Sequence, residues 1–191
     1  NVEETTQLVD IYETSRQEME GQEARLGYAH HDVVDNSAST LIREHTEEGI
    51  RILEYTLESN PEDARALRTV GDLYTRTGQD EEAADRLAKA VKLDGSNALT
   101  WRKLATTYVK LKRFEQAEEA LRKATKLRPD FVEAWVDLGN VVHRLQRYSE
   151  AERMFRKADK LDPKMAIIPF NQALNFMATN QFRRAKAFFG E

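Results

Sequence analysis

The stretch WRKLATTYVKLKRFEQA, residues 101–117, is repeated 34 residues later as WVDLGNVVHRLQRYSEA, residues 135–151. The charged letters change between the two copies, whereas most of the apolar and small letters are kept. The retained positions are Trp101/Trp135, Leu104/Leu138, Leu111/Leu145, Arg113/Arg147, Ala117/Ala151, Leu127/Leu161 and Pro129/Pro163. A fixed period of this length indicates a chain built from repeated structural units.

The apolar positions within one copy have helical spacing. Trp101, Leu104, Tyr108 and Leu111 follow one another at three or four residues, which places them on one face of a helix. Residues 114–127 repeat this spacing, and the proline that follows ends the second helix because it has no N–H to donate. Helices this short are marginal alone in water. Each period therefore predicts two helices packed against each other, with alanine or glycine where they approach closely.

The order Trp, Leu, small residue, Tyr, Ala and Pro at this period resembles the tetratricopeptide repeat (TPR) family. The same order is visible one period earlier at Val70, Gly71, Tyr74 and Ala83. Ala105 stands where the family pattern has glycine, and Val142 where it has an aromatic residue. The resemblance implies an all-α fold in which antiparallel helix pairs stack into an α-solenoid.

The repeat frame also divides the chain. Residues 30–63 are expected to form a degenerate TPR-like helix pair, with Thr46 as the N-cap of its second helix. Because the sequence begins with Asn1 rather than Met, we expect a processed form or a fragment of a longer protein. The predicted segments are an acidic helical segment that could cap the solenoid (1–29), the degenerate pair (30–63) and a TPR array (64–191) with repeats at 64–97, 98–131, 132–165 and, in part, 166–191.

Composition limits the classes of function. Hydrophobic residues make up 40% and charged residues 32% of the chain, which suits a soluble helical protein. The absence of cysteine excludes disulfides, a thiol nucleophile and cysteine-based zinc sites. No apolar run is long enough to predict a transmembrane helix. We expect a cytoplasmic protein, with the periplasm or an organelle surface left open.

The net charge of −4 is unevenly distributed. Residues 1–63 carry 4 Lys and Arg against 16 Asp and Glu, a net charge of −12, whereas the remainder carries 25 against 17, a net charge of +8. One interpretation is that these charges only solvate helix surfaces. The other is that the acidic head contacts a basic surface, in its own chain or in a neighbouring copy.

No residue pattern predicts catalysis. The sequence has no phosphate-binding glycine loop, no GxSxG and no HExxH, so we predict neither an enzyme nor a cofactor. His30, His31, Asp32 and Asp35 could bind a metal ion, but a solvated helix entrance explains them more simply, and no metal site is predicted. Nucleic-acid binding is unlikely on this pattern, because basic residues alternate with acidic ones at helical spacing, as in Glu118 and Arg122.

The resemblance to TPR proteins implies that the concave surface, formed by the first helix of each pair, holds a peptide or helix of another protein. Arginines dominate the early positions and apolar residues the last ones, so the expected partner segment is acidic or amphipathic. The implied groove residues are Arg65, Arg68, Asp72, Arg102, Thr106, Val109, Lys110, Val136, Asn140, His143, Arg144, Phe170, Leu174 and Met177.

One family specialisation does not fit. Chaperone-binding members hold a terminal carboxylate with Lys and Asn on the first helices, but the matching pair here is Arg68 and Asp72. Glu133 and Asp137 occupy the later positions and would repel a carboxylate. A heat-shock cochaperone is therefore not predicted.

Three functions remain as hypotheses. The first is a scaffold or adaptor that binds a protein segment in its groove and assembles a multiprotein complex. The second is self-assembly, in which the acidic head of one copy enters the basic groove of the next, as in family members that coat organelles. The third is the targeting or regulatory arm of a larger enzyme.

Overall fold

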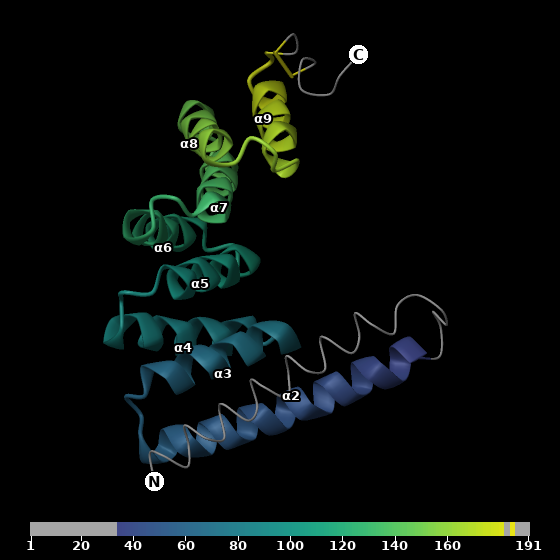
Figure 1. Ribbon diagram of the computed structural model, residues 1–191, viewed down its shortest axis with the longest axis vertical. Helices are drawn as coiled ribbons and strands as arrows, with labels where there is room; N and C mark the ends of the chain where they lie inside the picture. The colour runs from purple at the N-terminus through teal and green to yellow at the C-terminus, as the bar shows by residue number, and fades with distance from the viewer. Residues whose placement is uncertain (1–33, 182–183, 186–191) are drawn as a thin grey trace. The chain divides into compact units, whose positions relative to one another are not determined.

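The computed structural model describes residues 34–181 and 184–185, with side chains described from Thr46 onward. All regular structure in this part of the chain is helical, which confirms the predicted all-α repeat fold (Figure 1). The helices are α2 (Val34–Ser59), α3 (Ala64–Thr77), α4 (Asp80–Leu93), α5 (Ala98–Lys110), α6 (Phe114–Leu127), α7 (Val132–Arg144), α8 (Tyr148–Leu161) and α9 (Ile167–Ala178).

The helix pairs follow the sequence period. The first helices α3, α5 and α7 begin at Ala64, Ala98 and Val132, which are 34 residues apart. Each is joined to its second helix by a short turn, and one residue with positive φ lies in each of these turns and in the turn after α9. These residues are Gly78 (77°), Lys112 (58°), Gln146 (61°) and Asn180 (58°), again 34 residues apart. A left-handed residue at this point lets the chain reverse within two or three residues.

Side-chain caps start two of the first helices. Asp63 accepts hydrogen bonds from the backbone N–H groups of Arg65 and Ala66, both at 2.9 Å. Asn97 accepts one from the backbone N–H of Thr100 at 3.1 Å. These caps satisfy N–H groups that have no partner within the helix, and they fix where α3 and α5 begin.

The chain divides into two compact units, residues 1–93 and 94–191. In the described part of the first unit, α2 packs on α3 and α3 packs on α4 around Leu53, Leu67 and Val70. Glu54 joins all three helices, because its carboxylate accepts hydrogen bonds from Tyr74 Oη at 3.0 Å and from Arg86 at 2.8 Å. Desolvation, followed by the hydrogen bond to Glu54, raises the pKa of Tyr74.

The segment before the first pair differs from the sequence prediction. Instead of two helices over 30–63, residues 34–59 form the single helix α2, and Thr46 lies buried within it rather than at an N-cap. Neither proline nor glycine occurs between 34 and 48, so nothing in the sequence breaks the helix there. The predicted acidic segment 1–29 lies outside the described residues.

In the second unit, α5 packs on α6, α7 on α8, and neighbouring pairs contact through α6 and α7 and through α8 and α9. Trp101 and Trp135 are partly buried against this core. Their indole N–H groups donate to the carbonyl oxygens of Gly95 and Pro129, each at 2.9 Å and six residues earlier. The repeated tryptophan therefore both packs on the core and fixes the loop that enters its own repeat.

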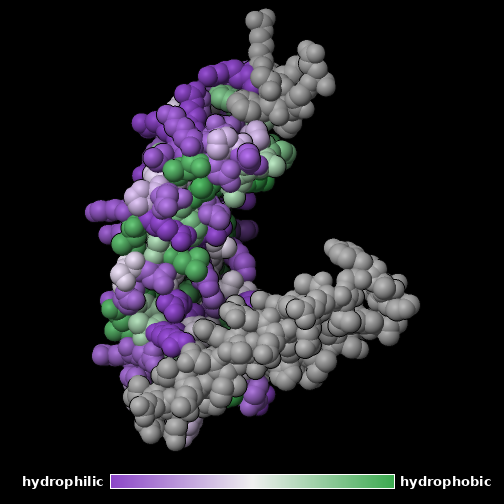
Figure 2. All heavy atoms as spheres, in the orientation of Figure 1, coloured by the Kyte–Doolittle hydropathy of each residue, from purple (hydrophilic) through white to green (hydrophobic). Residues whose placement is uncertain are grey.

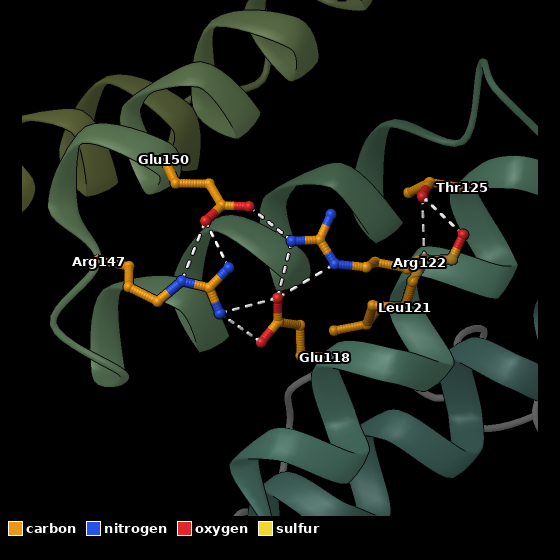
Figure 3. Close-up of polar contacts among 6 residues, drawn as sticks. All are labelled: Glu118, Leu121, Arg122, Thr125, Arg147 and Glu150. Atoms are coloured by element: carbon orange, nitrogen blue, oxygen red, sulfur yellow. Dashed lines mark hydrogen bonds and ion pairs between the residues drawn. The ribbon is translucent and has the colours of Figure 1, made fainter.

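A four-member charge network ties the second helices α6 and α8 together (Figure 3). Arg122 and Arg147 each form ion pairs with both Glu118 and Glu150. The distance from each arginine to a carboxylate oxygen of Glu118 is 2.7 Å. The ion pair between Glu118 and Arg122 confirms the pairing predicted from their spacing. The hydrogen bond from Arg122, and then that from Arg147, lower the pKa of Glu150.

Candidate functional site

A pocket of about 750 Å³ lies beside α7 in the second unit. Its walls come from α5 and α6, from α7 and the turn after it, and from the start of α8 and from α9. The lining residues are Thr106, Val109, Phe114, Leu121, Asp137, Asn140, Val141, His143, Arg144, Gln146, Tyr148, Asn171 and Leu174. First helices thus supply most of the lining residues, which include both polar and apolar side chains.

The structure brings six of the groove residues implied by the sequence into this pocket: Thr106, Val109, Asn140, His143, Arg144 and Leu174. Lys110, Phe170 and Met177 are exposed but lie outside the pocket lining. Val136 is only 5% exposed and packs with Ala158 and Ile168, so its side chain contributes to the core. Arg65, Arg68 and Asp72 are half-buried on α3 in the first unit.

Arg102 already has a carboxylate partner within the protein. Its Nε donates to Asp137 Oδ2 at 2.6 Å, which joins α5 to α7. Burial raises the pKa of Asp137, although Arg102 acts in the opposite direction. This intramolecular pair neutralises the acidic group at the pocket wall, and it leaves Arg102 less available to an external carboxylate than the sequence pattern suggested.

His143 is held in place by Asn175 of α9. Asn175 is 2% exposed, and its Nδ2 donates to the carbonyl oxygen of Tyr148 at 2.9 Å. Since Nδ2 is the donor, Oδ1 faces His143 Nδ1 at 3.0 Å, and the imidazole must donate from Nδ1. The ring of Tyr148 packs edge-on against the imidazole at 5.2 Å. These contacts lock α9 onto the turn between α7 and α8.

Apolar side chains form a stripe along the exposed face of α9. Ile167, Phe170, Leu174 and Met177 recur at helical spacing and are 40–49% exposed. Elsewhere, Figure 2 shows apolar patches interrupted by charged and polar side chains on the visible described surface. A row of large apolar groups on one helix is a common feature of surfaces that bind other proteins.

Sequence reasoning missed several polar residues of the pocket. Asn171 lines the pocket and Asn175, one helical turn further along α9, contacts its wall residue His143; both are more than nine-tenths buried. Their spacing of four, inside an otherwise apolar segment, is the signal that could have identified them. Gln146 and Tyr148 were also missed, because they belong to the turn and second helix rather than to a first helix.

Neither a metal centre nor a membrane span is found in the described part of the chain. The described side chains, those of residues 46–181 and 184–185, contain no group of three or more His, Asp or Glu placed to hold a metal ion. None of the helices there has both the length and the apolar character to cross a membrane. The His30–Asp35 cluster considered in the sequence lies outside the described side chains.

The fold and the repeated positions define this chain as a TPR protein. Residues 5–191 match the family described as "Cilia and flagella-associated protein 70 C-terminal domain", so the chain belongs to that family. A comparison with curated proteins found no match.

Solved structures share the fold at low sequence identity. A crystal structure of MamA is 20% identical with a TM-score of 0.74, over 84% of this chain and 92% of MamA. MamA from Desulfovibrio magneticus RS-1 is 19% identical with a TM-score of 0.73, over 81% and 88%. YrrB, described as a TPR protein with an unusual peptide-binding site, is 23% identical with a TM-score of 0.71, over 80% and 78%.

Proposed function

We propose that this chain is a protein-interaction scaffold that binds a peptide or helix of a partner protein on the first-helix surface of its second unit. The pocket beside α7 carries the proposal, because its lining combines apolar side chains with polar and charged ones, and it adjoins the exposed stripe of α9. Binding sites for protein segments commonly combine apolar anchors with a few directed polar groups. An acidic or amphipathic segment fits best, since Arg144 is exposed and makes no ion pair among the described residues.

The comparisons support the same class of function. YrrB is described as having a peptide-binding site, and the family of this chain is named after cilia and flagella. We place the scaffold in a cilium or flagellum, where it would hold a partner segment within a larger assembly. No catalytic role is proposed. A role as the arm of a longer enzyme is tested by reading the open reading frame from which this chain derives.

The test is direct binding of short peptides to the intact chain. A peptide array that covers ciliary and flagellar proteins would select candidates, and calorimetry would give their dissociation constants. Leu174→Glu should weaken the selected peptides about tenfold or more by placing a charge on the apolar wall. Arg68→Glu should act similarly if the partner segment also contacts the first unit. Circular dichroism must show unchanged helix content, and failure of every peptide class to bind contradicts the proposal.

Self-assembly is a second candidate, favoured by the net charges of −12 and +8 on the two parts of the sequence. In this case the acidic residues 1–63 of one copy would contact the basic part of the next. Contacts between exposed charges are screened by salt, so sedimentation at low and high salt should show large assemblies that dissociate as salt rises. A monomer at low salt argues against this candidate and leaves peptide binding intact.

A further inference from the structure

A row of cations lies on the exposed face of the second helix α8. Arg153, Lys157 and Lys160 follow one another at four and three residues, which places them on one face of the helix. Lys164 follows in the turn after α8, and all four residues are exposed. None of the four forms an ion pair with another residue in the described part of the chain. We call these four residues the α8 cation row.

The pairing of the nearby arginines contrasts with this row. Arg156 of α8 donates to Glu152, four residues earlier, and Arg122 of α6 makes the equivalent bond to Glu118. These two arginines therefore serve the fold. Cations of the row instead stand one turn apart, and like charges at this spacing destabilise a helix. The helix dipole favours a cation in the last turn, but it does not favour Arg153, which lies near the middle of α8.

The equivalent positions of the other second helices carry acids. Arg153 corresponds to Glu119 in α6 and to Asp85 in α4, one and two periods earlier, whereas the lysine one turn later is kept in all three helices. Lys164 corresponds to Asp130. Since α4 and α6 fold with an acid at the first of these positions, the repeat itself does not require the cation. An anion from outside the protein accounts for the exchange.

The shape and the surroundings of the row indicate a linear anion. Along the helix axis, Arg153 and Lys160 are about 10 Å apart, a distance that about three residues of extended polypeptide span. Acidic residues flank the row, because Glu152, Asp159 and Asp162 are half-buried in the same segment. A planar anionic membrane would meet these acids as well, whereas a single chain can follow the cations between them.

Nucleic acid fits the row less well than an acidic polypeptide does. Single strands are held by stacking on aromatic rings, but the two aromatic residues of α8 are not exposed: Tyr148 is half-buried and Phe155 is 1% exposed. Phosphates are also held best by the fork of arginine, and three of the four cations are lysines.

We propose that the α8 cation row is a docking surface for an unstructured, glutamate-rich segment of a partner protein, bound in extended form along the helix. The argument for this occupant is charge complementarity along a narrow row. The row lies on a second helix, whereas the proposed peptide site lies on first helices, so this inference goes beyond the proposed function and does not depend on it. Exposed charges are screened by salt, so the binding should weaken as salt rises.

The experiment uses the full chain and a short fluorescein-labelled peptide in which glutamates alternate with glycine and serine. Fluorescence anisotropy should show binding at low salt that weakens at high salt, and the same peptide with glutamine should not bind. Vesicles that contain phosphatidylserine and a single-stranded oligothymidine are tested beside it. Binding of either of these without binding of the glutamate peptide overturns the proposal.

Two variants at one repeat position separate the row from the overall charge of the protein. Lys157→Glu should weaken binding of the glutamate peptide about tenfold, since it replaces an attraction by a repulsion. Lys89→Glu is the matched control, because Lys89 is exposed at the same repeat position of α4 and the charge changes equally. It should change the affinity by less than about twofold. Equal weakening by both variants overturns the proposal.

Arg153→Glu separates recognition from folding by copying Glu119 of α6. It should weaken binding while slightly raising the melting temperature, because it replaces a like-charge pair with a favourable Glu and Lys pair one turn apart. A row that served only the fold predicts the opposite: a lower melting temperature and unchanged affinity.

Leu174→Glu distinguishes this surface from the proposed peptide site. If it abolishes binding of the glutamate peptide and Lys157→Glu does not, the peptide binds the first-helix surface, which overturns the docking surface and supports the proposed function. If the chain alone assembles at low salt and Lys157→Glu abolishes the assembly, the occupant is a second copy and not a partner protein.

Discussion

Gly139 of α7 faces Phe155 of α8 so closely that no side chain fits between them. A Cβ atom at Gly139 would lie 2.7 Å from Phe155 Cδ1 and 2.9 Å from its Cζ, and the ring is only 1% exposed. The equivalent positions are Ala105 with Leu121 one period earlier and Gly71 with Leu87 before that. The first-helix residue is thus small in all three repeats, and the large phenylalanine stands opposite a glycine.

Gly139→Ala should destabilise the protein in spite of the better helix propensity of alanine. The propensity gain is about 1 kcal/mol, whereas forcing a methyl group into a packed contact costs about 1–3 kcal/mol. We expect a net loss of about 1 kcal/mol in the free energy of unfolding, measured by urea denaturation. The pair Gly139→Ala with Phe155→Leu, which copies Ala105 and Leu121, should be more stable than the sum of the single changes predicts. Strict additivity of the two changes would contradict this contact.

Lys112 has a left-handed backbone conformation, with φ at 58°, in the turn between α5 and α6. That conformation is strained for a residue with a Cβ atom, and glycine relieves the strain. Lys112→Gly should therefore raise the free energy of unfolding by about 1 kcal/mol. Lys123 supplies the matched control because it is exposed inside α6. The same substitution there should lower stability by about 1 kcal/mol, and equal signs at the two positions would rule out the strain argument.

The helix pairs could be predicted from the sequence because the features that define them act over only a few residues. Apolar spacing and the prolines after the second helices act within a few residues of where they stand. The break expected at Thr46 was wrong for the same reason. Thr46 is a possible N-cap by residue type, but it stands in a continuous run of helix-compatible residues, and the structure buries it inside one long helix.

The polar contacts of the pocket could not be read from the repeat. Arg102 and Asp137 are 35 residues apart, and His143 and Asn175 are 32 apart, so each pair joins neighbouring repeats at positions where the letters vary. The repeat pattern correctly places such residues on the first-helix surface. It does not say whether a side chain is paired within the protein, as Asn175 is, or has a buried donor without a hydrogen bond, as Asn171 has.

Glu150 should make stability depend on pH through the network of Figure 3. Its pKa lies below the usual 4.5, mainly because Arg122 donates to it. A carboxyl with a lowered pKa in the folded state contributes stability above its unfolded pKa, and this contribution is lost as pH falls through the folded value. Wild type should thus melt above Glu150→Gln at neutral pH, by about 2 °C at most for an exposed network.

The difference in melting temperature between wild type and Glu150→Gln should disappear below about pH 4, because the protonated carboxyl group then resembles the amide. Melting curves of both proteins across the acid range measure it. Glu119→Gln is the control, since Glu119 is exposed on α6 next to Glu118 but lies outside the network. A gap between wild type and Glu150→Gln that stays constant with pH would show that the ion pairs contribute nothing.

Arg102 and Arg144 both lie on the first-helix surface, but only Arg102 has a carboxylate partner, and their substitutions should differ accordingly. Arg102→Glu removes the 2.6 Å contact and sets two carboxylates against each other where side chains are 31% exposed. We expect a loss of about 1–2 kcal/mol in the free energy of unfolding. Arg144→Glu should cost less, about 0.5–1 kcal/mol, because it removes only the exposed contact of the guanidinium with the Phe114 ring at 5.7 Å.

The combined change Arg102→Glu with Asp137→Arg should recover most of the loss, because it restores opposite charges on α5 and α7. Urea denaturation of the four variants and wild type measures each effect. Wild-type stability in Arg102→Glu would show that the pair is not formed in solution. If the pair is formed, Arg102→Glu both removes a cation and disturbs the pocket wall, so weaker peptide binding by this variant would have two causes. Arg144 has no carboxylate partner among the described residues. It is therefore the better position for testing the charge of the surface.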